Sequence, residues 1–287
     1  MVVWVLLQRF SDTFLYKIDS ILMNVYFGIK MTGIIGAVSE FGTYVTSVTT
    51  ILSSLFAPLL LIRYSKKQWA DYKQMTVDGA YIVGLFSGLL CALLCGSAPT
   101  LLELWLGHDF ASYGLWMTIK LIVIPYTTAG AMFANGYLYA NYNKRPAIVS
   151  LILAVLNVFV NICLLHVFSS VIMFLVVCLV FVLMQGLCMN IWFYNHIYKS
   201  GFKPVMGDTV KYTIYMMLIM ALTYVTDCVF NIHTLLQLFV VYLIVFIVGI
   251  VVIDSVFLKP RHREMLIEII PIYGNLRLKI TKSLIRS

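Results

Sequence analysis

Charged side chains lie within or beside two segments that are otherwise almost entirely apolar, 10–29 and 113–140. The residues concerned are Arg9, Asp12, Lys17, Asp19 and Lys120. A charge at the centre of a membrane-spanning helix costs roughly 2.5–3.5 kcal/mol on insertion scales, so such a side chain usually faces a bundle interior or a water-filled cavity. The chemistry that these residues predict is electrostatic, because cations held where water is scarce attract an anionic ligand strongly.

The spacing of the N-terminal charges defines one polar face of a helix. Asp12 and Asp19 are seven residues apart, and Tyr16 follows Asp12 by four, so the three side chains share a face. Arg9 precedes Asp12 by three residues, and we expect the two to pair at one end of the helix. A helix with this many charges is expected to line a polar interior.

Lys120 lies seven residues into its apolar segment, about 10 Å along a helix, which is a long reach for a lysine that must find the surface. We therefore expect Lys120 to face a cavity, with Glu40 as its partner or as a neighbour of Lys17. A second interpretation remains open, in which Asp12, Lys17 and Asp19 form an internal ion-pair network that fixes helix packing.

Several other chemistries lack their sequence signals. The chain contains no GxxxxGK[ST] loop, so ATP-driven transport by this chain alone is not expected. It contains no HExxH motif, and its six cysteines form no CxxC pair. We expect no cofactor, no metal site and no enzymatic activity.

Composition places the chain in a membrane. Hydrophobic residues make up 62% of its 287 residues, only 11% are charged, and the mean hydropathy is +0.96. Soluble domains are nearer 45–50% apolar and about 25% charged. The net charge of +8 does not indicate a nucleic-acid partner, because the basic residues border apolar segments.

The apolar segments predict an all-α membrane protein with about eight transmembrane helices, since each is roughly long enough to cross the hydrocarbon core as a helix. We place the crossings at 10–29, 36–62, 79–102, 113–140, 147–168, 170–194, 210–229 and 235–258. Pro58 and Pro125 fall inside two of them and are expected to bend the helices. Gly84 and Gly88 form a GxxxG motif that is typical of close helix packing.

The basic residues are distributed unevenly between the predicted loops. Seventeen of the twenty lie on one side of the membrane. They are Arg9 and the basic residues of the C-terminal tail and of the loops after the second, fourth and sixth crossings. The opposite loops contain only Lys30. The positive-inside rule therefore predicts a multi-pass protein of the cytoplasmic (inner) membrane with both termini in the cytoplasm. Asp254 is expected to pair with basic residues at this inner surface. For Met265–Ile272 two alternatives stay open, an amphipathic helix on anionic lipid headgroups and a frayed basic tail.

Several segments together resemble polysaccharide flippases of the Wzx type, within the multidrug/oligosaccharidyl-lipid/polysaccharide exporter superfamily. The resemblance is carried by the order and spacing of Lys17–Lys30, Thr32–Ser39, Ser54–Pro58, Leu101–Gly107 and Asn141–Pro146, the last followed by an apolar segment with Asn157 and Asn161. It covers most of residues 10–200. Family members usually have two six-helix lobes, so this chain resembles the C-terminal portion of a flippase.

The resemblance implies a division of the chain into three parts. Residues 1–200 would form one six-helix lobe, 201–258 an additional two-helix pair and 259–287 a basic cytoplasmic tail. The family's cavity lies between two lobes, and this chain resembles only one of them. The resemblance therefore implies that the chain is a fragment, that it pairs with a second chain or with another copy of itself to supply the other lobe, or that it is a degenerate protein.

The resemblance also implies a substrate. This is an oligosaccharide linked to undecaprenyl (polyprenyl) pyrophosphate, which is moved from the inner to the outer leaflet for surface polysaccharide such as the O-antigen of lipopolysaccharide. Lys17, Lys120 and Arg9 would attract the pyrophosphate, and the lipid tail would stay among the membrane lipids. Tyr16 and Tyr44 would pack against sugar faces. The carboxylates of Asp12, Asp19 and Glu40 would pair with the cations or couple transport to a proton or sodium ion.

Three other functions remain as alternatives. One is a cation-coupled antiporter of small molecules, which a cationic cavity disfavours. Another is an integral membrane enzyme that acts on lipid-linked sugar, although the outer loops leave little room for a donor substrate. The third is a membrane scaffold without catalytic activity, which would tolerate the loss of every buried charge.

Overall fold

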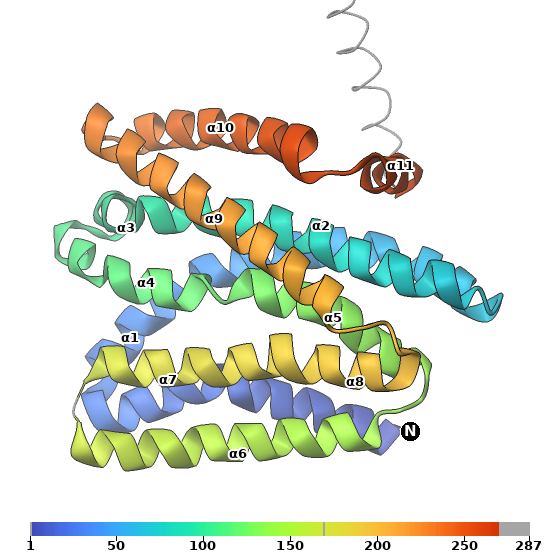
Figure 1. The fold of residues 1–287 in the computed structure, drawn as a ribbon. Coiled ribbons are helices and arrows are strands. Elements are labelled where there is room, and N and C mark those ends of the chain that lie inside the picture. Colours follow the sequence, from blue (N-terminus) through green and yellow to red (C-terminus); the bar gives the residue numbers. More distant parts are fainter. Residues whose placement is uncertain (1, 169, 270–287) are drawn as a thin grey trace, which may run out of the picture.

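The computed structural model describes residues 2–168 and 170–269, and this part of the chain contains helices and no strand. The α-helices are α1 (Val2–Ser65), α2 (Trp69–Gly96), α3 (Ala98–Leu106), α4 (Gly114–Leu121), α5 (Ile124–Tyr139), α6 (Lys144–Val167), α7 (Val171–Leu183), α8 (Asn190–Tyr198), α9 (Lys203–Phe230), α10 (Leu235–Val252) and α11 (Pro260–Ile269) (Figure 1). The 3₁₀-helix η1 (His108–Tyr113) and the π-helices η2 (Met184–Met189) and η3 (Ile253–Phe257) complete the described elements. The prediction of an all-α membrane protein is confirmed.

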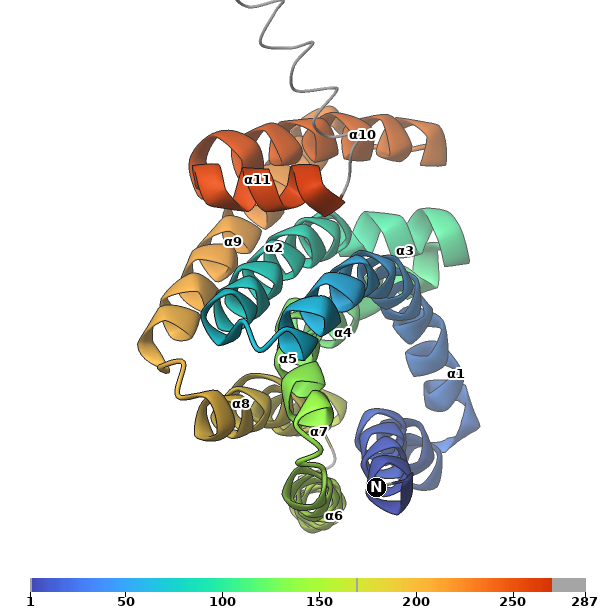
Figure 2. The same cartoon turned by 90° about the vertical axis from the view of Figure 1, so that its right-hand side faces the viewer.

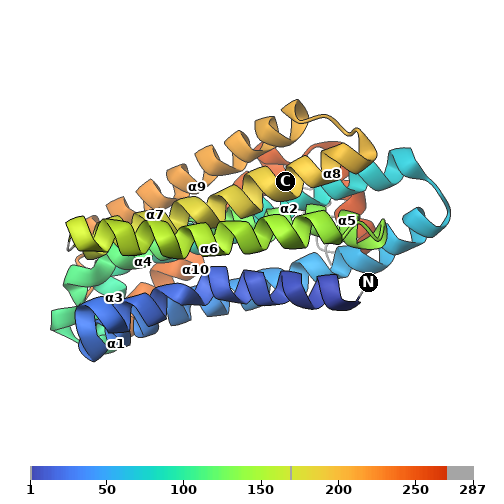
Figure 3. The same cartoon turned by 90° about the horizontal axis from the view of Figure 1, so that it is seen from below.

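The first element, α1, reverses direction at Gly28. A straight helix of its 64 residues would be about 96 Å long, far more than the roughly 30 Å of a bilayer core. Gly28 breaks it with φ 81° and ψ 174°, a conformation that costs glycine little because it has no Cβ. The first arm (2–27) and the second arm (29–65) therefore run in opposite directions (Figure 3). A single glycine thus replaces the loop that we expected near 30–35.

Seven helical stretches of the described chain are long and apolar enough to cross a membrane. Because α1 reverses at Gly28, these seven stretches supply eight crossings, in agreement with the sequence. The fourth crossing is interrupted between α4 and α5, directly before Pro125. Pro58 lies inside α1 without a break, since Gly28 is where the backbone of α1 departs from helical angles.

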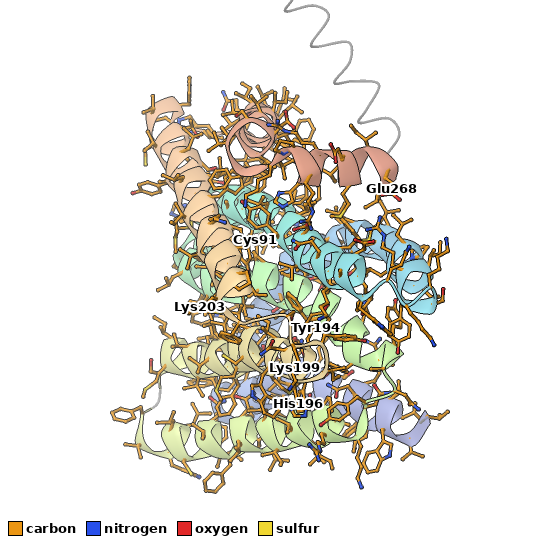
Figure 4. The ribbon with its side chains drawn as sticks, turned by 45° about the vertical axis from the view of Figure 1, so that its right-hand side comes forward. Cys91, Tyr194, His196, Lys199, Lys203 and Glu268 are labelled. Atoms are coloured by element: carbon orange, nitrogen blue, oxygen red, sulfur yellow. The ribbon has the colours of Figure 1, made fainter. Side chains whose placement is uncertain are left out.

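The bundle has α2 in its centre. In the most apolar 18-residue stretch of α2, 83% of the residues are buried. In the corresponding stretch of Leu235–Phe257, which contains α10, 17% are buried, so α10 lies on the outside. The first arm of α1 packs on α6 and α7 through Ile18, Leu22 and Phe174, whereas the second arm packs on α2 (Figure 2). Gly84 lies against the ring of Tyr212 in α9, which agrees with the packing role expected of the GxxxG motif. Cys91 of α2 is fully buried in this interior (Figure 4).

The connections that carry basic residues lie at one end of the bundle. These are the α1–α2, α5–α6, α8–α9 and α10–α11 connections, and the described N-terminus lies at the same end (Figures 1 and 3). Lys199 and Lys203 flank the α8–α9 connection (Figure 4). The Gly28 turn and the α2–α4, α6–α7 and α9–α10 connections lie at the opposite end. The helices thus collect the positive loops on one side, as the positive-inside rule requires.

Candidate functional site

Lys120 and Asp19 form an ion pair inside the bundle. The ammonium Nζ of Lys120, at the end of α4, contacts Oδ2 of Asp19 on the first arm of α1. The Asp19 side chain is 6% exposed and that of Lys120 is 20% exposed. The backbone N–H of Ser20 donates to the other carboxylate oxygen of Asp19 at 2.8 Å. The partner of Lys120 is therefore Asp19 and not Glu40, because Lys120 lies on the side of α4 that meets the first arm.

Asp12 lies in a cluster of neutral polar side chains. The amide of Gln8 donates to Asp12 Oδ1 at 2.9 Å and to the Ser150 hydroxyl at 2.6 Å. The amide of Gln185 donates to the same two groups, with 3.1 Å to Ser150. Asp12 forms no salt bridge within the described residues. Arg9, its expected partner, lies within electrostatic range of Asp12, and the two amides supply the hydrogen bonds.

This cluster leaves two buried oxygen atoms unused. The side-chain carbonyl oxygens of Gln8 and Gln185 have no hydrogen-bond partner among the residues that the structure describes, although both atoms are buried. Gln185 is 4% exposed and lies in the π-helix η2, an irregularity that is frequent at functional sites. The carboxylate of Asp12, the two amides and the Ser150 hydroxyl thus bring oxygen atoms from α1, α6 and η2 together.

The remaining predicted site residues lie on the outside of α1. Arg9, Tyr16 and Lys17 are exposed on the first arm, and Glu40 is exposed on the second. Lys17 is still within electrostatic range of Lys120. Neither Lys17 nor Glu40 forms an ion pair with any described residue. The expected Asp12–Lys17–Asp19 network is therefore not formed, because the two carboxylates point inward and the lysine points outward.

A further charged cluster lies between α2 and α11, at the end of the bundle with the basic loops. Asp78 is buried, and it accepts hydrogen bonds from Gln74 at 3.0 Å and from Arg261 at 2.5 Å. Nε2 of His262 lies 3.4 Å from the same carboxylate. A polar cavity of about 480 Å³ adjoins this cluster, lined by Arg63, Asp71, Gln74, Asp78, Arg261, Glu264 and Glu268 among others.

This cluster changes the interpretation of the C-terminal segment. Met265 and Leu266 of the expected amphipathic patch are buried in the bundle core and face protein, whereas Ile267 is exposed. Residues 270–272 of that patch lie outside the described residues. Arg263 lies 3.4 Å from Asp254, as we expected for that acid. Glu268, labelled in Figure 4, pairs with Arg63 of α1 at 3.3 Å.

Sequence reasoning missed four polar residues of these clusters, namely Gln74, Asp78, Ser150 and Gln185. Ser150 and Gln185 are neutral and lie in apolar runs, where only their polarity distinguishes them. Asp78 lies just outside the predicted crossing 79–102, where a charged residue is common and does not indicate a buried site. No group of three or more His, Cys, Asp or Glu side chains suited to a metal ion occurs in the described part of the chain.

Comparison with known proteins gives one distant relative. The uncharacterized membrane protein EpsK of Bacillus subtilis (strain 168) is 27% identical over 155 residues, which are 54% of this chain and 31% of the relative. The matched region thus spans about a third of that protein's length. No protein-family model matches the chain, and no solved structure matches it. The similarity agrees with a multi-pass membrane protein.

Proposed function

We propose that the protein takes part in moving a lipid-linked oligosaccharide, carried on a polyprenyl pyrophosphate, from the inner to the outer leaflet of the cytoplasmic membrane. The observation that carries this proposal is the exposed polar surface on both arms of α1. A bundle that met only lipid would expose apolar side chains there, because polar groups in hydrocarbon are costly. The resemblance of segments within residues 10–200 to Wzx-type flippases supports the same function, in surface polysaccharide synthesis.

The roles of the individual residues follow from their positions. Lys17 and Arg9 are free to attract a pyrophosphate, because they point outward and form no ion pair with a described residue. Lys120 already has Asp19 as its partner and would position the first arm of α1. Tyr16 and Tyr44 are 41% and 64% exposed and are available to pack against sugar rings.

Flipping can be measured directly in vesicles. Purified protein is reconstituted with a fluorescent polyprenyl pyrophosphate, and an impermeant quencher reports how much of the label reaches the outside. We expect Lys17→Ala to slow transfer at least tenfold while the protein still inserts. Lys30→Ala is the matched control, since Lys30 is an exposed lysine near the Gly28 turn. Transfer at the rate of empty vesicles with the wild-type protein, or at the wild-type rate with Lys17→Ala, would contradict the proposal.

The Asp12 cluster is the best candidate for ion coupling. Rotating either glutamine amide by about 180° exchanges its oxygen and nitrogen. The unused oxygens of Gln8 and Gln185 would then join Asp12 and Ser150 around a small cation, and hard cations prefer oxygen ligands. A cation that binds only the folded state raises stability by about 2.7 kcal/mol at 100 times its Kd. We expect sodium chloride, but not choline chloride, to raise the melting temperature of the wild type and not of Asp12→Asn. Equal melting in both salts would exclude a sodium site, while leaving the flipping measurement unaffected.

The alternative functions predict different results in the same vesicles. A small-molecule antiporter would move cationic compounds and leave the lipid label unmoved. A membrane enzyme would turn over a labelled sugar donor. A scaffold would show no loss of function with Lys17→Ala.

A further inference from the structure

The two arms of α1 carry exposed polar stripes of opposite charge. The exposed polar residues are Arg9, Thr13, Tyr16, Lys17 and Asn24 on the first arm, and Glu40, Thr43, Tyr44, Thr46, Ser47, Thr50 and Ser54 on the middle part of the second. Lys30, which follows the Gly28 turn, and Ser65, at the far end of the second arm, are also exposed. The first stripe is basic, because the acids of that arm, Asp12 and Asp19, are held inside by their partners. Glu40 is the only charged residue between 31 and 62.

Lipid alone is a poor environment for these stripes. Several hydroxyls are already satisfied, since Thr13, Thr43 and Ser47 each donate to a carbonyl of their own helix. The charged side chains have no such solution, because Lys17 and Glu40 form no ion pair with a described residue. A buried charge in a membrane usually pairs or meets water.

The Gly28 turn sets the two charges at the same depth. Lys17 lies eleven residues before Gly28 and Glu40 twelve residues after it, which is about 17 and 18 Å of helix from the turn. Thr13 and Thr43 are likewise both fifteen residues from Gly28, one on each arm. Because the arms run in opposite directions (Figure 3), residues that are equally far from Gly28 along the two arms lie at comparable distances from the turn.

The two charges do not meet within one copy of the chain. The first arm packs on α6 and α7, the second arm packs on α2, and the arms diverge from the turn (Figure 2). A twofold axis along the membrane normal keeps every residue at its own depth. Such an axis would place the basic stripe of each copy opposite the acidic stripe of the other, so the interface would contain two equivalent contacts.

We propose that this α1 surface pairs with a second copy of the chain, with Lys17 of each copy facing Glu40 of the other. The surface is self-complementary, as an interface with twofold symmetry requires. Like charges juxtaposed across an interface weaken association strongly, so charge reversal tests the pairing. The proposal goes beyond lipid transport, since association and transfer are measured separately. Lys17 cannot serve both roles at once, so the surface that attracts a pyrophosphate when it is open is covered when two copies pair.

The test uses two opposite charge reversals in the full chain, reconstituted in lipid discs and sized by light scattering. We expect wild-type dimers, and for Lys17→Glu alone or Glu40→Lys alone a dimer at least about tenfold weaker. When the two variants are mixed, the carboxylates of one face the ammonium groups of the other, and a heterodimer is expected to form. That rescue also shows that each variant is folded. Lys30→Glu is the control and should remain a dimer.

Three results would overturn the proposal. One is a wild-type protein that stays monomeric at every concentration in lipid. Another is a dimer that both single reversals leave unchanged. The last is that the two variants remain monomeric when mixed, although each keeps the helical circular dichroism of the wild type. The partner of this surface would then be a different membrane protein.

Discussion

Lys120 contacts Asp19 across the interface between α4 and the first arm of α1, and both side chains are largely withdrawn from the surface. The contact joins two parts of the bundle that are far apart in sequence. Ile18 and Leu22, on the same arm as Asp19, pack with the layer formed by α6 and α7, whereas Lys120 lies directly before the interruption that separates α4 from α5. The pair therefore fixes the first arm against the centre of the molecule.

Removing one member of this pair should destabilise the protein strongly. Asp19→Ala leaves the Lys120 ammonium uncompensated, and losing one partner of a buried pair typically costs about 3–5 kcal/mol. Replacing both members with apolar residues, Asp19→Leu with Lys120→Met, should cost much less, because no charge is left without a partner. Thermal unfolding in detergent measures both effects. A double variant as unstable as the single one would show that the pair is not the cause.

Sequence reasoning predicted the crossings well, since hydropathy over some twenty residues depends little on the partner of each helix. It also predicted bends at Pro58 and Pro125, and the fourth crossing is interrupted directly before Pro125. We expected Lys120 to face a cavity, whereas in the structure its ammonium contacts Asp19. Sequence reasoning could not choose the partner of Lys120, because that choice depends on which helices pack together. We expected Glu40 as that partner or as a neighbour of Lys17, and the packing of the first arm supplies Asp19 instead.

The other differences between prediction and structure arise from contacts and conformations that no local sequence pattern encodes. Gln185 and Ser150 gather around Asp12 only because η2 and α6 meet α1 there, a contact that no local pattern encodes. The reversal at Gly28 depends on one backbone conformation in a helical sequence. Asp78 becomes a buried group only when α11, nearly two hundred residues later, packs over it.

The close approach of α5 to η2 should make Gly130 intolerant of a side chain. A Cβ at Gly130 would lie 2.3 Å from the carbonyl oxygen of Gly186, and that backbone cannot move aside as a flexible side chain could. We expect Gly130→Ala to lower the free energy of unfolding by about 1–3 kcal/mol, the usual cost of overpacking. Gly207→Ala is the control, because open space surrounds Gly207 and alanine favours the helix. Equal melting temperatures for the two variants would contradict this packing.

Asp78 should hold α11 on the bundle. Asp78→Ala removes the shared acceptor of Arg261 and His262, and hydrogen bonds to charged groups contribute about 1.5–3 kcal/mol each. We expect amide hydrogen exchange in residues 260–269 to accelerate at least tenfold, while α2 and α9 stay protected. Asp71→Ala is the matched control, since Asp71 lines the same cavity but is exposed. Unchanged exchange in α11 would show that the burial of Met265 and Leu266 is sufficient to hold it.

The end of the bundle that gathers the basic connections should face the cytoplasm, because positively charged loops are retained on that side during insertion. Single cysteines test this orientation in a background in which the exposed Cys163, Cys188 and Cys228 are replaced by serine. A cysteine at Lys67, in the α1–α2 connection, should react with a membrane-impermeant maleimide only after the cells are permeabilised. A cysteine at Asp109, in η1 at the opposite end, should react in intact cells. The reverse pattern would invert the topology, and the proposed direction of lipid transfer would then lose its support.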